Sequence, residues 1–403
     1  MRAWNSAAAA SALILAAICA SCSAPRSAGA PRPRVVVVTP SAAFAPDEFR
    51  GAEAVVNARS AGGSKGELSH AVLPDAAMST GNPEAAVASF IAEASSDSRV
   101  AAIVVDPALP GSAEGIRRAK QSKPGLLGVS GGSREDILAL EASADLVVDL
   151  DRVYRAYLIP WAAKKMGAKA LVAAYSQGEY ADPASERERA IMSAASADLG
   201  LRYAAMTAPP GADAAGYARA MTGAWLRDYG PDASLYCSDA KLAAPILAGA
   251  IAGGGIIVDA AGRATRSAYA AVLGLDLGPA GGDVGKERRL LERALAALDG
   301  RGRFGEWDAD YAEASVEGLG EFALRVVTGA ARKDDLGDLL AALDARSPGA
   351  AWLAAYDVDP DTGLKSVNRV LLRQDVYVLG SGYLQSALQP VPDRYLAIRA
   401  SGP

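Results

Sequence analysis

The sequence is poor in the residues that hold metals and covalent cross-links. Its 403 residues contain a single histidine, His70, and three cysteines, Cys19, Cys22 and Cys237. One histidine argues against a multi-histidine metal site. Positive charge is not in excess either, because 41 Lys and Arg stand against 46 Asp and Glu. Nucleic-acid binding needs clustered Lys and Arg, so this balance argues against a nucleic-acid partner.

Long repeats are also missing. The 41 glycines and 22 prolines follow no period, and no heptad pattern persists along the chain. The hydrophobic fraction of 51% is enough for a packed core. Together these features exclude a disordered, collagen-like or coiled-coil chain. At about 100–200 residues per domain, the length fits two or three domains.

The first residues have the pattern of a targeting segment. Arg2 precedes an apolar run from Ala7 to Ala20, which is too short to cross a bilayer. Small residues then precede Cys22, as in a signal peptide of a lipoprotein. We predict a signal peptide at residues 1–21, lipidation at Cys22 and a flexible tether at residues 22–33. Cys19 stands where such sites usually carry an aliphatic residue, and plain secretion is the alternative.

The predicted processing leaves two cysteines, Cys22 and Cys237. A disulfide within the chain would then consume the lipid anchor. Cys237 ends an apolar stretch, so we expect it to be a small buried hydrophobic residue.

Apolar strands alternate with amphipathic helices from Arg34 onward. Continuous apolar strands separated by helices indicate parallel sheets covered on both faces. The pattern restarts after residue 150, which predicts an α/β fold with two Rossmann-like lobes. The predicted strands are 35–38, 68–73, 101–105, 126–129 and 145–150 in the first lobe, and 170–174, 201–206, 234–237 and 255–258 in the second.

The last third of the chain cannot easily form a core of its own. We therefore expect it to return to the first lobe and complete both sheets. The first lobe is predicted at 34–150 plus about 277–355, the second at 151–276, and a final crossover with the C-terminal tail at 356–403. Asp151 and Tyr154 at the first crossover, and Asp276 near the second, are candidate hinge residues.

Candidate ligand-binding residues follow the predicted strands. Ligands of open parallel sheets bind beyond the carboxyl ends of the strands, and two facing lobes would place these ends along one cleft. Carboxylates and hydroxyls bind polar groups, and aromatic faces stack on planar rings. For the two aspartates below, helix capping is the alternative. The predicted ligand-binding residues are Thr39, Ser41, Phe44, Asp106, Ser130, Tyr175, Ser176 and Asp239.

Enzymatic motifs are weak. Gly128–Gly132 fits the G-x-S-x-G elbow around Ser130, but the base would be His70, which precedes the serine instead of following it. A serine hydrolase is therefore a remote alternative. We expect no catalytic residue, no metal and no cofactor. A DNA-binding regulator would need a basic helix-turn-helix where the targeting segment lies.

Several motifs, spread over residues 34 to 397, carry a resemblance to known proteins: Asp47–Glu53, Pro110–Glu114, Trp161–Ala168, Gly302–Trp307, Gly318–Glu321 and Gln374–Tyr377. Together they resemble type I periplasmic solute-binding lipoproteins. Within these, the resemblance is to an uncharacterised family of spirochaetes and clostridia, related to the basic-membrane-protein lipoproteins.

The resemblance implies the two-lobed fold of a type I periplasmic binding protein. It also implies capture of a small polar or heterocyclic solute, riboflavin-like or nucleoside-like, in a cleft between the lobes. The partners would be an ABC permease and, through the lipid anchor, the membrane at the outside of the cell. A lipoprotein that senses its ligand for a signalling partner is the alternative.

Overall fold

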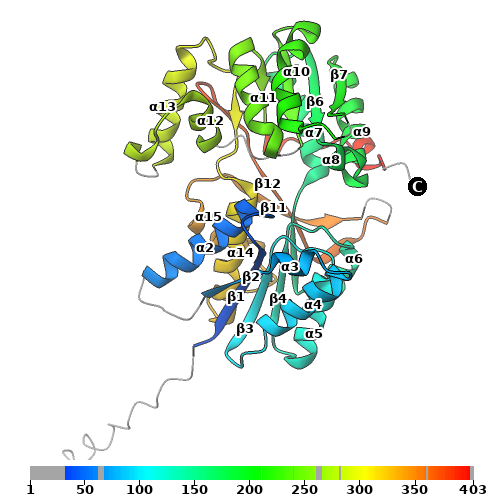
Figure 1. Ribbon diagram of the computed structural model, residues 1–403, viewed down its shortest axis with the longest axis vertical. Coiled ribbons are helices and arrows are strands. Elements are labelled where there is room, and N and C mark those ends of the chain that lie inside the picture. The colour runs from blue at the N-terminus through cyan, green and yellow to red at the C-terminus, as the bar shows by residue number, and fades with distance from the viewer. Residues whose placement is uncertain are drawn as a thin grey trace, which may run out of the picture.

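The computed structural model describes residues 32–61, 68–209, 211–238, 240–259, 266–280, 283–359 and 362–399. Two α/β lobes lie one above the other along the long axis of the molecule (Figure 1). The predicted signal peptide, Cys22 and Asp239 lie outside the described residues. Among the helices that are described, none is both long and apolar enough to span a bilayer.

The first lobe is built on a seven-stranded sheet of order β11-β12-β5-β4-β3-β1-β2. All neighbours are parallel except the edge pair β11 and β12. Val35–Val38 of β1 are buried on both faces, as expected for a central parallel strand. The strands are β1 (Arg34–Pro40), β2 (Leu68–Leu73), β3 (Val100–Val105), β4 (Leu127–Gly131), β5 (Leu146–Leu150), β11 (Trp352–Val358) and β12 (Lys365–Gln374).

Helices cover both faces of this sheet. One face packs against α2 (Pro46–Ala61), α14 (Tyr311–Val327) and α15 (Leu336–Arg346). The other packs against α4 (Pro83–Ala94), α5 (Ser112–Ser122) and α6 (Ile137–Ser143), and the short α3 (Asp75–Met78) follows β2.

The second lobe has a four-stranded parallel sheet of order β7-β6-β8-β9. Helices again cover both faces, with α7 and α9 on one and α10 to α13 on the other. Cys237 is buried in the core of this lobe, as predicted. The elements are β6 (Ala170–Tyr175), β7 (Arg202–Thr207), β8 (Ala233–Cys237), β9 (Ile256–Ile257), α7 (Arg152–Lys165), α8 (Gln177–Ala181), α9 (Pro183–Asp198), α10 (Ala214–Tyr229), α11 (Ala240–Gly253), α12 (Arg266–Leu273), η1 (Gly278–Ala280) and α13 (Val284–Ala296).

The chain crosses between the lobes three times. It leaves the first lobe at Asp151, returns between β10 (Gly305–Glu306) and α14, and leaves again between β12 and β13 (Tyr377–Val378). A small sheet of order β10-β13-β14, with β14 at Gly382–Tyr383, joins the last two crossings. The chain then ends with η2 (Ser386–Leu388) and α16 (Asp393–Leu396), which packs on α7 and α9.

Two lobe boundaries differ from the prediction. Residues 278–305, predicted in the first lobe, pack in the second, because Leu291, Leu295 and Phe304 belong to its core. Residues 365–374, predicted within the final crossover, form β12, which lies inside the first sheet beside β5. Both differences have the same cause. An apolar face packs on whichever lobe has an uncovered apolar surface, and the sequence pattern does not show which lobe that is.

Candidate functional site

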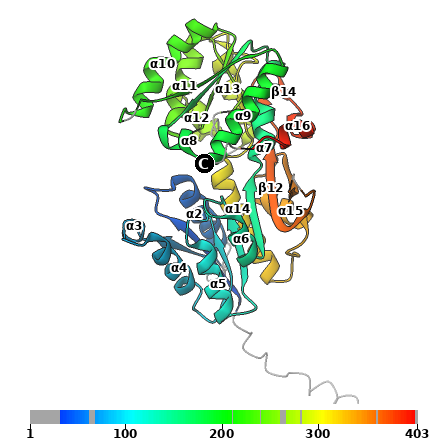
Figure 2. The ribbon, with the colours of Figure 1, turned by 90° about the vertical axis from the view of Figure 1, so that its right-hand side faces the viewer.

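The carboxyl ends of the parallel strands in the two lobes are turned toward each other. In Figure 1, α8, which follows β6, lies on the side of the second lobe that faces the first. Figure 2 places α2 and α3, which follow β1 and β2, on the opposing side of the first lobe. We call these two opposing surfaces the interlobe face. Because ligands of open parallel sheets bind beyond the carboxyl ends, this face is the candidate site.

A group of buried polar side chains lies where β3 ends in the first lobe. Asp106 is 1% exposed and accepts a hydrogen bond from Ser315 Oγ of α14, with Oδ2 and Oγ 2.9 Å apart. Glu48, in the first turn of α2, and Tyr311, at the start of α14, lie close enough for their charges and that of Asp106 to interact. We call Glu48, Asp106, Tyr311 and Ser315 the Asp106 cluster. It unites three segments that are far apart in sequence.

Two glycines at the end of β4 make room for this cluster. A Cβ atom on Gly131 would lie 2.4 Å from Asp106 Oδ2, and one on Gly132 would lie 2.8 Å from Oδ1. Gly132 also has a φ of 53°, which side chains disfavour. The Gly131–Gly132 pair is therefore explained by the close approach of the Asp106 carboxyl group, and not by a nucleophile elbow.

The cluster strongly perturbs its titratable groups. Burial, followed by the charge of Glu48, raises the pKa of Asp106 well above its usual range, against the opposing effects of Ser315 and Arg134. Burial and the charges of Asp149, Asp106 and Glu48 likewise raise the pKa of Tyr311. Such perturbation in a site formed by several segments is typical of functional sites.

Two members of the cluster have no hydrogen-bond partner among the described residues. Glu48 makes neither a hydrogen bond nor an ion pair there, and its carboxylate oxygens are not among the buried atoms that lack a partner, so they reach water. The Tyr311 hydroxyl oxygen, in contrast, is buried without a partner. Glu48 can therefore meet an incoming molecule directly, whereas the Tyr311 hydroxyl group is enclosed by protein.

The second lobe contributes charged and aromatic side chains from α7, α8 and α9. Arg152 Nε donates to Glu188 Oε1 at 2.5 Å. Arg189 lies over the ring of Tyr180, with its Cζ 3.9 Å from the ring centroid, and its buried Nη1 has no hydrogen-bond partner in the described part of the chain. This lobe therefore offers the guanidinium group of Arg189, which an aromatic ring contacts and which no carboxylate of the described residues pairs with.

Charged side chains of the two lobes interact across the interlobe face. Burial raises the pKa of Glu179 on α8, while Arg152 of its own lobe and Arg134 of the first lobe oppose the rise. Arg134 lies on the loop after β4, and its charge also acts on Asp106. The charge of Arg134 thus acts on carboxyl groups of both lobes.

A buried ion pair lies beside the first two crossings. Arg155 of α7 pairs with Asp259 after β9, with Nη2 and Oδ2 2.6 Å apart. The Arg155 guanidinium also lies over the rings of Tyr236 and Trp307, 5.4 and 5.5 Å from their centroids. A small cavity next to this pair is lined from all three crossings by Leu150, Asp151, Tyr154, Arg155, Leu158, Ile159, Val258, Asp259, Trp307, Arg373, Gln374 and Val376.

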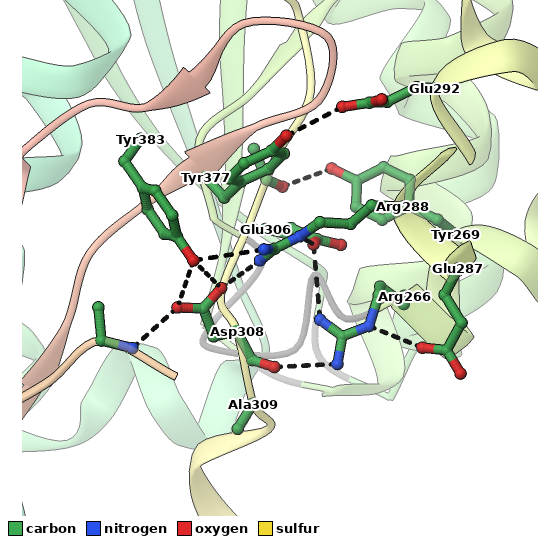
Figure 3. Close-up of polar contacts among 12 residues, drawn as sticks. Arg266, Tyr269, Glu287, Arg288, Glu292, Glu306, Asp308, Ala309, Tyr377 and Tyr383 are labelled. Carbon is green, nitrogen blue, oxygen red and sulfur yellow. Dashed lines mark hydrogen bonds and ion pairs between the residues drawn. The ribbon is translucent and has the colours of Figure 1, made fainter. Parts of the chain in front are cut away.

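A second polar network joins the last two crossings to both lobes (Figure 3). Asp308 accepts hydrogen bonds from Arg288 of the second lobe, from the Tyr383 hydroxyl group and from the backbone N–H of Ala351 in the first lobe. Arg288 also donates to Glu306 Oε1 at 2.6 Å, and Glu306 is fully buried. Asp308 is therefore a fixed point at which the two lobes meet.

Three predicted ligand-binding residues are buried away from the interlobe face. Thr39 is fully buried, and its hydroxyl group contacts His70 Nε2 at 2.8 Å and Pro40 O at 2.8 Å. Ser130 pairs in register with Val105, whose side chain packs on the α4–α5 face, opposite to Asp106. Tyr175 is 1% exposed and packs in the core around α9. The predicted stacking role of Tyr175 is therefore wrong for this conformation.

The geometry also argues against a serine hydrolase. His70 on β2 and Ser130 on β4 are separated by β1 and β3, which is about 14 Å at about 4.8 Å per strand. His70 Nδ1 instead contacts Glu53 Oε1 at 2.7 Å. No group of three or more His, Cys, Asp or Glu side chains within the described ranges is arranged to hold a metal ion.

Of the remaining predicted residues, some lie at the interlobe face and one does not. Ser41 and the 56% exposed Phe44 lie in the loop after β1, and Ser176 precedes α8, so all three remain candidates at the interlobe face. Asp276 is exposed after α12 within the second lobe and caps Gly278 N–H, so its predicted hinge role is wrong.

The other two hinge candidates lie at a crossing. The Asp151 side chain accepts from the backbone N–H of Tyr154 and caps α7 at the first crossing. The Tyr154 hydroxyl group donates to backbone carbonyls of the C-terminal segment, among them that of Ala387 at 2.8 Å.

Sequence reasoning missed Glu48, Tyr311, Ser315, Arg134 and Arg189. Glu48 lies in one of the family-like motifs, yet nothing in that motif distinguishes it from the neighbouring Asp47, which pairs with Arg50. Tyr311 and Ser315 are on the returning segment, and only its packing on the first sheet brings them to Asp106.

Comparison with known proteins places the chain among proteins of unknown function. The model of a family described as "Protein of unknown function (DUF3798)" matches residues 34–305, and a second family model matches residues 316–398. Two uncharacterized proteins of Treponema pallidum (strain Nichols) are similar. One is 31% identical over a match that covers 51% of this chain and 96% of its own length. The other is 30% identical over a match that covers 36% of this chain and 65% of its own length.

Solved structures share the fold. A crystal structure from Clostridium difficile 630, of a protein whose name suggests a transcriptional regulator, has a TM-score of 0.73 at 17% identity and covers 86% of this chain and 99% of its own. A substrate-binding protein of a sugar ABC transport system from Bordetella parapertussis 12822 has a TM-score of 0.49 at 15% identity over 92% and 95%. The similarity to the Clostridium difficile structure, together with the three crossings, confirms the predicted two-lobed α/β fold. At 17% sequence identity, this similarity shows the fold alone.

Proposed function

Because the chain belongs to the DUF3798 family of proteins of unknown function and folds into two facing α/β lobes, we propose that it is a solute-binding protein. One observation carries the proposal. The Asp106 cluster, a group of polar side chains from three separate segments, lies at the carboxyl ends of the first sheet, where the second lobe faces it. Polar side chains gathered at this edge of a parallel sheet are suited to recognition of a ligand.

Capture would proceed by closure of the lobes. A solute that contacts both the Asp106 cluster and the α8–α9 side of the second lobe stabilises the closed state by its differential affinity for that state. Three crossings form the hinge, as in other hinge-closing binding proteins. Asp308 and the Arg155–Asp259 pair hold the crossings in place while the lobes move about them.

The cellular role that we propose is delivery to an ABC importer from outside the cytoplasm, with a lipid at Cys22 as the anchor. Labelled palmitate should be incorporated into the protein in cells, and Cys22→Ala should abolish the incorporation. A Cys22→Ala variant that is still labelled would contradict the anchor assignment. Retention of the full label by a Cys19→Ala variant is the matched control.

The predicted ligand class, riboflavin-like or nucleoside-like, stays a prediction. The burial of Tyr175 removes one of its two expected stacking rings, whereas Phe44 remains exposed. Protein purified gently from cells and then denatured would release a flavin, with absorbance near 450 nm, or a nucleoside, with absorbance near 260 nm, and mass spectrometry would identify other molecules.

Small-angle scattering tests the proposed function itself. Addition of the molecule identified in that extract should reduce the radius of gyration of the ligand-free protein, because the lobes close. Glu93→Gln, an exposed carboxylate on α4, should close as the wild type does. A protein that binds this molecule without any compaction would refute capture by closure.

The alternative is a ligand sensor for a signalling partner. The name of the Clostridium difficile protein of similar fold points to a regulatory role in that protein. Closure is common to both roles, so the partner distinguishes them. Uptake of the solute that is lost on deletion of the gene supports import, and unchanged uptake supports sensing.

A further inference from the structure

A groove of about 470 Å³ lies on the second lobe along α13. Helix α13, the preceding turn η1 and the loop at Arg301 form this groove, and no residue of the Asp106 cluster or of α8 and α9 lines it. In Figure 1, α13 lies at the side of the second lobe away from α8 and α9. We call it the α13 groove. Its volume is in the range of sites for small molecules, and solute capture between the lobes makes no use of it.

Positive charge dominates the α13 groove. Lys286, Arg289 and Arg293 line it at spacings of three and four residues, so they share one face of α13. Arg301 lines it from the loop that follows the helix, and all four side chains are exposed. Like charges at these spacings repel each other and destabilise a helix. A bound anion would therefore stabilise this face of α13.

The carboxylates of the described residues match this charge only in part. Asp283, at the start of α13, contacts Lys286, with Oδ2 and Nζ 3.5 Å apart, and the charge of Arg289 also acts on it. Both side chains of the pair are exposed, and exposed ion pairs contribute little. Within the described ranges, Arg293 donates to the backbone carbonyl of Arg289 at 3.2 Å and to no carboxylate, and Arg301 pairs with no carboxylate.

The acidic residue that lines the groove, Glu292, is bound by the protein itself. Its Oε1 accepts hydrogen bonds from the Tyr377 hydroxyl group at 3.1 Å and from the backbone N–H of Gly380 at 2.9 Å (Figure 3). The stem of Arg301 lies against the same turn, because a Cβ atom on Gly380 would be 2.9 Å from Arg301 Cγ. This turn therefore holds both Glu292 and the stem of Arg301 at the groove.

The charges on the other side of α13 are paired. Arg288 donates to Glu306 Oε1 at 2.6 Å and also to Asp308 (Figure 3). Glu287 accepts from Arg266 Nε at 2.8 Å. The excess of positive charge is thus confined to the groove side of this helix.

The chemistry of the groove fits a phosphoryl group that is attached to an organic molecule. A guanidinium group binds the oxygens of phosphate with two parallel hydrogen bonds. A phosphate monoester carries a charge of about −1.5 to −2 at neutral pH, so it balances more of the excess charge than a carboxylate does. Apolar contact is available beside the cations, because the lining also includes Pro279, Ala280, Leu290 and Ala296.

We propose that the α13 groove binds a phosphate monoester, with its phosphoryl oxygens on Arg289, Arg293 and Arg301 and its organic part on the apolar lining. The site is separate from the interlobe face, so it is a second binding function and does not depend on solute capture. A soluble phosphate ester and the headgroup of a phospholipid such as phosphatidic acid present the same group, and the experiment distinguishes these two sources.

Isothermal titration calorimetry tests the chemical class. The protein is the Cys22→Ala variant, which lacks the proposed lipid, and the probes are phenyl phosphate and benzoate, which share an aromatic ring and differ in the anionic group. We expect phenyl phosphate to bind and benzoate to bind at least tenfold more weakly. Binding should also weaken as salt is added, because salt screens exposed charges. Equal affinity for the two probes would overturn the assignment of a phosphoryl site.

A double variant locates the site. Arg289→Gln with Arg293→Gln removes two exposed cations and should weaken binding of phenyl phosphate at least tenfold, since hydrogen bonds to charged groups are lost. Arg219→Gln, at an exposed position on α10, is the matched control and should leave the affinity unchanged. Circular dichroism would verify that the double variant is folded. Phenyl phosphate that binds the folded double variant as tightly as the parent would overturn the placement of the site in the α13 groove.

Co-sedimentation with vesicles identifies the source of the phosphoryl group. The vesicles are phosphatidylcholine with or without phosphatidic acid, and the protein is again the Cys22→Ala variant. Retention on phosphatidic acid that the double variant loses supports a lipid headgroup as the ligand. Binding of phenyl phosphate without retention on these vesicles supports a soluble phosphate ester. Absence of binding to phenyl phosphate and to both kinds of vesicle would overturn the proposal and leave the solute-binding function intact.

Discussion

Replacement of Arg155 by methionine should destabilise the second lobe strongly. The Arg155–Asp259 pair is almost completely buried, with Asp259 1% exposed. Removal of one partner of a buried ion pair leaves the other charge without its counterion and costs about 3–5 kcal/mol. Arg155 also loses its contacts with Tyr236 and Trp307, which adds to the loss. We expect a loss near the upper end of this range.

Urea denaturation followed by tryptophan fluorescence would measure this loss, because Trp307 lies against Arg155. The exposed pair Lys169–Asp232 provides the control, since Lys169→Met should cost no more than about 1 kcal/mol. The double variant Arg155→Met with Asp259→Asn should recover a large part of the loss, because no isolated charge remains. A loss below about 1 kcal/mol for Arg155→Met alone would refute the assignment of a buried, tightly coupled pair.

Three further predictions concern the cluster and the crossings. The raised pKa of Asp106 means that the folded protein keeps a proton that the unfolded chain releases near pH 3.9, so stability should fall as the pH rises from 4 toward 7. Asp106→Asn should flatten this profile in urea titrations, and an unchanged slope would contradict it. Gly131→Ala should cost about 1–3 kcal/mol in thermal unfolding, because its Cβ would meet Asp106. Gly178→Ala, which has open space, should be nearly neutral, and equal effects would refute the steric argument. Tyr154→Phe should lower the free energy of unfolding by about 1 kcal/mol and speed amide exchange at residues 386–389, because its hydroxyl group bonds this segment. Tyr157→Phe should not have these effects. Unchanged slow exchange in Tyr154→Phe would show that these hydrogen bonds do not hold the C-terminal segment.

Much of the fold follows from local pattern. The β-branched run Val35–Val38 and the apolar strands after it predict a parallel sheet, because strands buried on both faces need apolar side chains at every position. The restart of the pattern near Asp151 predicts the second lobe. The path of the returning segment is not determined in this way, since both α13 and α14 have an apolar face to bury but pack on different lobes.

The candidate site was only partly predictable for the same reason. Asp106 is identifiable because a carboxylate after a buried strand lies at the ligand-binding edge of a parallel sheet. Tyr175 has the same position at the end of its strand, yet α9 covers its ring, which the strand pattern cannot show. Glu48, Tyr311 and Ser315 have ordinary helical sequence contexts and acquire their role only from proximity to Asp106.

The sequence by itself therefore determined the α/β alternation, the two lobes and the edge of each sheet where polar groups gather. These properties depend on hydrophobic periodicity, which is local along the chain. Tertiary structure alone decided which polar side chains are brought together and where the lobes are joined. The surroundings of a polar group depend on its neighbours in space, and for Asp106 these include Ser315, 209 residues further along the chain.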